Sequence, residues 1–358
     1  MSEEKITIPR ASELSAFSCV SEYRTQLMGL AALWILCFHE WVPVLGNVPV
    51  LGWVEGFIKN TGFCGVDMFF FLSGMGLPFA IAKSSLGQFY YKRLRRLAIP
   101  FLVIATVRML TEQWLFGNYL KAITGYSFYT SNMYTLLWFV PAIASFYLVF
   151  PLYYRFMSRS NNPYLFTATV LVIWLLLSNV LDGHLREDLY GFTNRIPIFL
   201  LGILFGWAGK NGKSFTYKAS HIVFLFSLLA LGIYLSYRSN YIGVYILVPV
   251  SNCCIPNALM SSSLCCLISL GLKKLSGTFI RGRVLKFFGL FTLEFYCVQE
   301  WLAGRILNSI LEMTTPFLAN ILFLLFVILF AYALYWINLG FWKLVDLLVG
   351  LLPKKERA

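Results

Sequence analysis

The sequence contains few charged residues. Only 13% of its 358 residues are Asp, Glu, Lys or Arg, whereas about 25% is usual for a soluble domain. Hydrophobic residues make up 59% of the chain. A soluble protein of this length and composition would have to expose much apolar surface. The composition therefore excludes an ordinary cytosolic enzyme, a disordered chain and a secreted disulfide-rich domain, and it predicts a polytopic membrane protein.

Two signals are also missing. The first 23 residues are polar and mixed in charge, without the apolar core and cleavage site of a secretory signal. None of the eight cysteines has the spacing of a metal ligand, and seven stand in apolar surroundings. We interpret the cysteines as small buried hydrophobes and expect no metal site.

Acidic residues are scarcer than basic ones, and the net charge is +13. On a soluble protein this excess would suggest nucleic-acid binding. On a membrane protein it is explained first by the enrichment of Lys and Arg in cytoplasmic loops. We therefore expect no nucleic-acid partner.

The apolar runs lack strict alternation, so they predict helices rather than the strands of a barrel. Ten runs are long enough to cross a bilayer. They cover 25–44, 62–82, 97–116, 134–156, 164–181, 194–209, 219–237, 243–271, 284–307 and 317–350. Pro249 and Pro256 would break or bend the eighth run, and the tenth is long enough to continue along the membrane surface. The expected fold is an all-α, polytopic membrane protein.

The basic residues predict the orientation. Ten spans put both termini on one side, and with that side inside, the outer loops hold only Lys59, Lys121, Arg186 and Arg238. Both termini are therefore expected in the cytoplasm. The predicted parts are a cytoplasmic segment at 1–23, a ten-helix transmembrane domain at 24–350 and a cytoplasmic tail at 351–358.

Ionisable residues within a bilayer are costly and mark functional sites. The candidates are His39, Glu40, Asp67, Arg108, Glu112, Arg195, Glu294, Glu300 and Asp346. Arg108 and Glu112 are four residues apart and could simply neutralise each other. Asp346 lies near a predicted cytoplasmic end, where it would face solvent.

His39 is the most informative candidate. Arg24 precedes it by 15 residues, so both face one side of the first helix, about 22 Å apart along its axis. Arg24 would lie near the inner surface and His39 in the outer half. A histidine can accept a proton at neutral pH. The alternative is a core histidine held by hydrogen bonds.

Two further patterns follow. The second span carries Gly65-Val-Asp67-x-Phe-Phe-x-Leu-Ser-Gly74, in which Asp67 and Gly74 share a face and the glycines permit close helix approach. Asp67 would then lie near the first helix, or it could cap a helix. After this span come Lys92, Arg93, Arg95 and Arg96. These four cations could bind a phosphate group at the membrane surface, or anchor the protein to anionic lipid.

In this order the patterns resemble the membrane-bound acyltransferase-3 family, which includes bacterial O-acetyltransferases of surface carbohydrates. Later segments agree, including Leu137-Trp-Phe-Val-Pro141, Arg195-Ile-Pro197 and Gly289–Glu300. The resemblance covers essentially the whole chain but marks a divergent subgroup. Family members usually carry an Arg eleven residues before the His, where this chain has Met28, and Arg24 is the candidate replacement. Many also have His-Glu where this chain has Gln299-Glu300.

The resemblance implies transfer of an acyl group, with acetyl as the leading expectation, from acyl-CoA to a carbohydrate hydroxyl at the inner (plasma) membrane. His39 would be the general base, and Asp67 or Glu40 would orient its ring or stabilise the imidazolium. Arg24 or Arg195 would bind a CoA phosphate or steady developing negative charge. Lys92, Arg93, Arg95 and Arg96 would dock CoA from the cytoplasm, and the pantetheine arm would reach His39 through a cavity between helices.

Two alternatives compete with this interpretation. Buried charges in a ten-span bundle would also suit a transporter or flippase of a polar or glycolipid substrate, although the internal repeat common in transporters is not evident. A catalytically inactive membrane scaffold is the other alternative. The acceptor sugar, a lipid-linked acceptor and a larger acyl group all stay open.

Overall fold

The computed structural model describes residues 15–130, 137–181, 187–241, 254–274 and 283–351. These ranges are α-helical, with a single isolated bridge between Ser15 and Thr216 outside the helices. The helices of the first half are α1 (Ala16–Glu22), α2 (Arg24–Glu40), α3 (Pro49–Asn60), α4 (Cys64–Ala82), α5 (Leu86–Thr111), α6 (Phe116–Ile123), α7 (Tyr126–Thr130) and α8 (Phe139–Arg159). Those of the second half are α9 (Pro163–Leu181), α10 (Glu187–Thr193), α11 (Ile196–Lys210), α12 (Ala219–Tyr241), α13 (Cys254–Lys274), α14 (Leu285–Leu290), α15 (Thr292–Leu302), α16 (Leu307–Met313) and α17 (Pro316–Leu351). The all-α expectation is confirmed for this part of the chain.

Six of the described helices are long and apolar enough to cross a membrane. They are Cys64–Ala82, Phe139–Arg159, Gly191–Lys210, Ala219–Arg238, Cys254–Lys274 and Pro316–Gly350. The stretch Pro163–Ser178 is a shorter apolar helix. A total of about ten spans, and the side on which the termini lie, stay predictions.

Three predicted spans differ clearly from the helices of the structure. The third begins eleven residues early, at Leu86, because Ser85 and Gln88 form a capping box that starts α5 there. The ninth is broken at Phe291 into α14 and α15. The first ends at Glu40 and is preceded by the unpredicted short helix α1. The eighth begins at Cys254 within the described residues, and 242–253 lie outside them.

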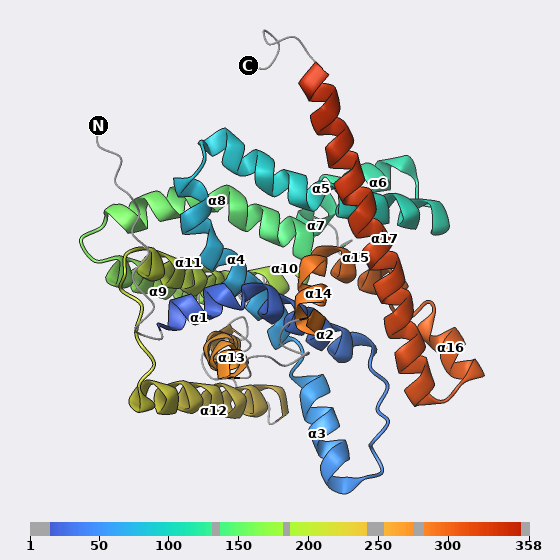
Figure 1. The fold of residues 1–358 in the computed structure, drawn as a ribbon, viewed down its shortest axis with the longest axis horizontal. Helices are drawn as coiled ribbons and strands as arrows, with labels where there is room; N and C mark the ends of the chain where they lie inside the picture. The colour runs from blue at the N-terminus through green and yellow to red at the C-terminus, as the bar shows by residue number, and fades with distance from the viewer. Residues whose placement is uncertain (1–14, 131–136, 182–186, 242–253, 275–282, 352–358) are drawn as a thin grey trace.

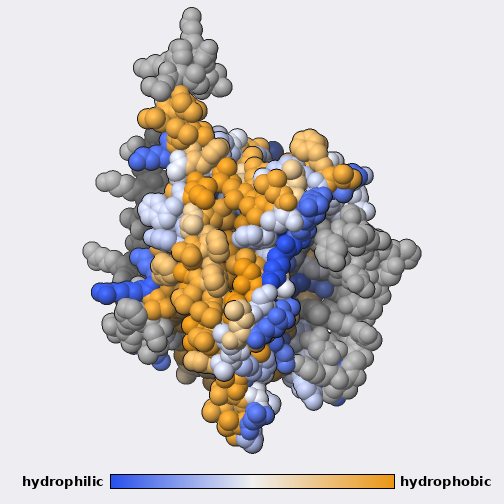
Figure 2. All heavy atoms as spheres, turned by 90° about the vertical axis from the view of Figure 1, so that its right-hand side faces the viewer, coloured by the Kyte–Doolittle hydropathy of each residue, from blue (hydrophilic) through white to orange (hydrophobic). Residues whose placement is uncertain are grey.

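Helix α4 is the centre of the molecule (Figure 1). It contacts α2, α5, α8, α11 and α13, and most of its residues are buried. Helix α3 projects from the lower edge and α12 lies along that edge. Helix α17 runs along the right side, and its outer surface is largely apolar (Figure 2). The exposed apolar residues of α17 include Phe317, Leu329 and Trp336, which suits contact with lipid chains.

Candidate active site

His39 lies on the last turn of α2 and its side chain is exposed. Its ring packs edge-on against Phe38, with the ring centroids 4.9 Å apart. Within the described residues the imidazole forms no hydrogen bond. Within the described chain, His39 therefore has neither the burial nor the hydrogen bonds of a structural core histidine.

The segment that follows His39 is held by Glu55 of α3. The Glu55 carboxylate accepts hydrogen bonds from the Trp41 indole at 2.8 Å and from the backbone N–H groups of Val44 and Leu45 at 2.9 and 2.7 Å. Partial burial alone would raise the pKa of Glu55, but these hydrogen bonds outweigh it and lower the pKa. Lys59 donates to the Trp41 carbonyl at 2.7 Å. The connection beside His39 is therefore a fixed structure.

Glu40, the residue after His39, interacts with a second set of polar groups at the same end of α2. It accepts a hydrogen bond from the backbone of Gly304, and Lys59 and Glu300 lie near enough to interact with its charge. Glu300, which belongs to the Gln299-Glu300 pair, also interacts with Arg108. The predicted pairing of Arg108 with Glu112 is confirmed at 2.7 Å, and Arg305 bonds the same carboxylate.

Asp67 meets partners other than His39. It is fully buried, lies 3.6 Å from the Arg195 Nε and accepts a hydrogen bond of 3.1 Å from the Asn257 side chain. Arg195 also donates to the Gly191 carbonyl at 3.0 Å and lies over the Trp138 ring. Asp67 therefore joins α4 to α11 and α13.

The spacing of Gly65 and Gly74 explains why Asp67 faces α11 and α13. A Cβ on Gly65 would lie 2.6 Å from the Ala31 carbonyl oxygen of α2, and one on Gly74 would lie 2.6 Å from the Phe199 carbonyl oxygen of α11. Nine residues separate these glycines, which puts them on opposite faces of α4, and Asp67 shares the Gly74 face. Because Ala31 precedes His39 by eight residues, Gly65 lies about 12 Å deeper along α2 than His39 does, and Asp67 lies deeper still.

Arg24 and Arg93 form a pair of cations near the beginning of α2. Arg24 donates to the Leu72 carbonyl at 3.1 Å, and its guanidinium lies beside Gly76, where a Cβ would be 3.5 Å away. Arg93 lies close enough for its charge to interact with that of Arg24. Both face Tyr147, whose ring centroid is 5.4 Å from the Arg93 guanidinium.

This pair has no acidic partner. Neither Arg24 nor Arg93 forms an ion pair within the described part of the chain, and the buried Arg93 Nε has no hydrogen-bond partner there. Two adjacent cations without a carboxylate repel each other and attract an anion. The pair therefore has the character of a phosphate site.

The other cations of the basic run point elsewhere. Arg95 binds Asp346 of α17 in a bidentate contact of 2.6 and 2.8 Å and lies over the Trp342 ring. Arg96 binds the buried Glu294 of α15 at 2.5 and 3.0 Å. Lys92 is exposed. Successive residues of a helix are about 100° apart, so the run spreads around α5 rather than forming one four-cation surface.

Two buried amide side chains, those of Asn257 and Gln299, were not predicted from the sequence as parts of the site. Asn257, the partner of Asp67, stands as a polar residue directly after Pro256 in the eighth predicted span, and this position was the available signal. The side-chain amide nitrogen of Gln299 is buried without a partner among the described residues. Its place in the Gln299-Glu300 pair was the only hint of it.

A comparison with models of known protein families finds the same family that the sequence motifs resemble. A family model described as an acyltransferase domain, that of the acyltransferase-3 family, matches residues 26–336. The match contains His39, Asp67, the basic run and Arg195, and it begins two residues after Arg24. No curated protein and no solved structure matches the chain. Because the match covers most of its length, the chain belongs to the acyltransferase-3 family and is a membrane acyltransferase.

Proposed function

We propose that this protein is an O-acyltransferase of the inner (plasma) membrane. It moves an acyl group, with acetyl as the leading candidate, from acyl-CoA to a hydroxyl of a cell-surface carbohydrate or its lipid-linked precursor. The observation that carries the proposal is the half-buried pair of Arg24 and Arg93, which has no acidic partner in the described chain. At the other end of α2, the exposed His39 supplies a base.

The donor is a polyanion, and unpaired guanidinium groups are good ligands for its phosphates. We assign Arg24 and Arg93 to the phosphates, together with the exposed Lys92, which precedes Arg93 in the sequence. Arg95 and Arg96 already bind Asp346 and Glu294, so their role in this proposal is to fix α5 against α17 and α15. Arg195 likewise fixes Asp67, and neither residue of that pair contacts the donor.

His39 acts as the general base in the transfer. Its imidazole takes the proton of the acceptor hydroxyl while the hydroxyl oxygen attacks the thioester carbonyl. The new C–O bond forms, the C–S bond breaks, and the departing CoA sulfur takes up a proton. General-base assistance of this kind contributes about 10²–10⁴ in rate. An acyl-histidine intermediate is the alternative route to the same products.

The distance between the two ends of α2 determines how far the bound donor must reach. Arg24 and His39 are 15 residues apart, which is about 22 Å along the helix. The phosphates would bind at the predicted cytoplasmic end and the pantetheine arm would extend toward His39. The acceptor would then approach His39 from the opposite side of the membrane, beside the connection that Glu55 fixes.

Purified protein in lipid nanodiscs, supplied with acetyl-CoA and a candidate carbohydrate, tests the proposal directly. We expect release of the CoA thiol that depends on the acceptor, and an acetyl ester on the carbohydrate. The transporter alternative gains no support from the family match. It predicts movement of a substrate across vesicles without consumption of acetyl-CoA, and that result would overturn the proposal.

A further inference from the structure

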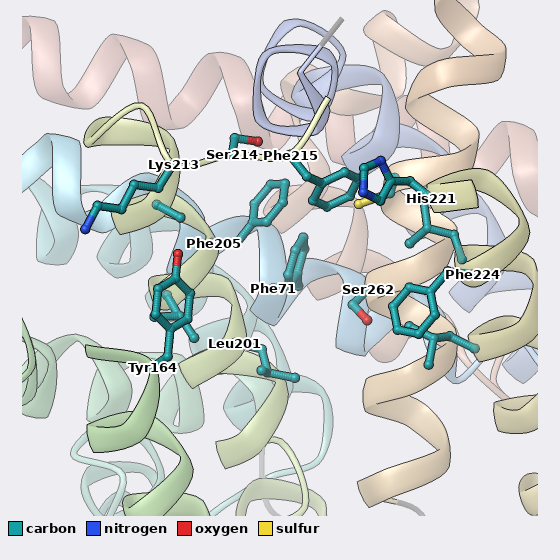
Figure 3. A pocket seen from close by; sticks show the side chains of 15 residues that line it. Phe71, Tyr164, Leu201, Phe205, Lys213, Ser214, Phe215, His221, Phe224 and Ser262 are labelled. Carbon is teal, nitrogen blue, oxygen red and sulfur yellow. The ribbon is translucent and has the colours of Figure 1, made fainter. Parts of the chain in front are cut away.

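A pocket of about 490 Å³ lies between α11, α12 and α13 (Figure 3). Its volume is within the range of about 300–1,000 Å³ that is usual for small-molecule sites. Its walls are mostly apolar and come also from α4 and α9. Its lining includes Leu201, Leu204, Lys213, His221 and Phe224. None of His39, Arg24 or Arg93 lines it.

Lys213, Ser214 and His221 line one end of this pocket, with Lys213 and His221 on opposite sides of it (Figure 3). Lys213 and His221 belong to the connection between α11 and α12 and to the first turn of α12, whereas Leu201 lies deep along α11. The His221 ring packs against Phe215 with the centroids 5.2 Å apart. Its buried Nδ1 has no hydrogen-bond partner in the described chain. The pocket thus has an apolar body and a polar mouth.

The charge of the mouth is positive. Lys213 is exposed and lies over the Trp207 ring, 5.0 Å from its centroid. Lys213 makes no ion pair within the described residues, and none of the lining residues is acidic. A single cation suits one phosphate group. CoA carries several phosphates, and the pocket offers it no second cation beside Lys213.

The length of the pocket along α11 matches the hydrocarbon thickness of one bilayer leaflet. Leu201 and Lys210 are nine residues apart on α11, which corresponds to about 14 Å. Half of the hydrocarbon core of a bilayer is about 15 Å. The Lys-rich connection between α11 and α12 is on the predicted cytoplasmic side, so the pocket would extend from the headgroups of that leaflet to the middle of the membrane. Phe224 and Val223 of α12 are exposed, which leaves the pocket open to the side from which a lipid enters.

We propose that this pocket is a binding site for an anionic phospholipid of the cytoplasmic leaflet. One acyl chain fills the apolar space between α11 and α12, and the phosphate lies beside Lys213. The lipid would fasten α12, which packs against α13, to the rest of the bundle. This site is independent of the acyl transfer proposed above.

Native mass spectrometry of the purified full-length protein, with added phosphatidylglycerol or phosphatidylcholine of identical chains, tests the site. Wild-type protein should retain one phosphatidylglycerol more tightly than phosphatidylcholine. Lys213→Gln should weaken phosphatidylglycerol binding about fivefold, the effect of one basic residue at a lipid surface. Lys218→Gln is the matched control, because Lys218 is exposed in the same connection but does not line the pocket.

A second pair of variants tests the chain-binding part. Leu204→Trp should fill the pocket and reduce retention of both lipids, whereas Phe226→Trp, on the exposed side of α12, should not. If Lys213→Gln and Lys218→Gln change retention equally, the lipid is held only by general surface charge and the proposal is wrong. Equal retention of the two lipids by the wild type would also overturn it.

Discussion

At the scale of the residue, arginines that are neighbours in sequence have different contacts. Arg93, Arg95 and Arg96 stand within four positions of one another, but each faces a different helix. Arg95 and Arg96 reach the carboxylates of Asp346 and Glu294, and Arg93 lies against Tyr147 beside Arg24. The sequence shows four adjacent cations. It cannot show which of them are neutralised, because their acidic partners are about 200–250 positions away along the chain.

This difference predicts unequal effects on donor binding. Arg93→Gln should raise KM for acetyl-CoA by about 10- to 100-fold, the effect of losing one charge-assisted hydrogen bond worth about 1.5–3 kcal/mol. Arg95→Gln removes an exposed ion pair, typically worth about 0–1 kcal/mol, and should change KM much less. Steady-state kinetics of both variants in nanodiscs measures this. An equal rise in KM for both would show that the basic run binds the donor as a single surface.

At the scale of the element, α4 organises the candidate site through its two opposite faces. The Gly65 face packs on α2 and the Gly74 face packs on α11. The nine-residue spacing of these glycines could have predicted from sequence that Asp67 turns away from α2. The identity of its partners could not be predicted, because Arg195 and Asn257 come from helices more than 120 positions away. The break of the predicted ninth span at Phe291 was not predicted, because no proline marks it in the sequence.

The buried contact of Asp67 predicts a loss of stability. Asp67→Asn leaves the Arg195 charge without its counter-ion, and breaking a buried pair from one side typically costs about 3–5 kcal/mol. The Tm of the variant in detergent should fall well below that of the wild type. Asp346→Asn is the control, because it breaks an exposed pair, and its Tm should change little. If Asp67→Asn keeps the wild-type Tm but loses acyl transfer, Asp67 acts in the chemistry instead.

At the scale of the whole molecule, the low content of charge predicted a membrane bundle, and the apolar surface agrees with that prediction. The all-helical architecture followed from the long apolar runs. The orientation rests on the distribution of Lys and Arg alone. The proposed function depends on it, because the donor must bind at the cytoplasmic end of α2 and the acceptor at the other end.

Two exposed glycines allow the orientation to be measured. Gly46, in the connection after His39, and Gly87, at the start of α5, both have open space where a Cβ would lie. Single Gly46→Cys and Gly87→Cys variants should therefore fold normally. A membrane-impermeant maleimide should label Gly46→Cys in intact cells, and Gly87→Cys only after the membrane is opened. The reverse pattern would put the donor site on the outer side, with the unsubstituted protein as the labelling control.

The central claim is that the imidazole of His39 removes the proton from the acceptor hydroxyl. His39→Gln keeps a polar side chain of similar size at an exposed position of α2, so the variant should retain the wild-type Tm and KM for acetyl-CoA. Its rate of acyl transfer, measured as acceptor-dependent release of the CoA thiol, should fall by about 10²–10⁴. A well-folded His39→Gln protein that transfers the acyl group at the wild-type rate would contradict the account.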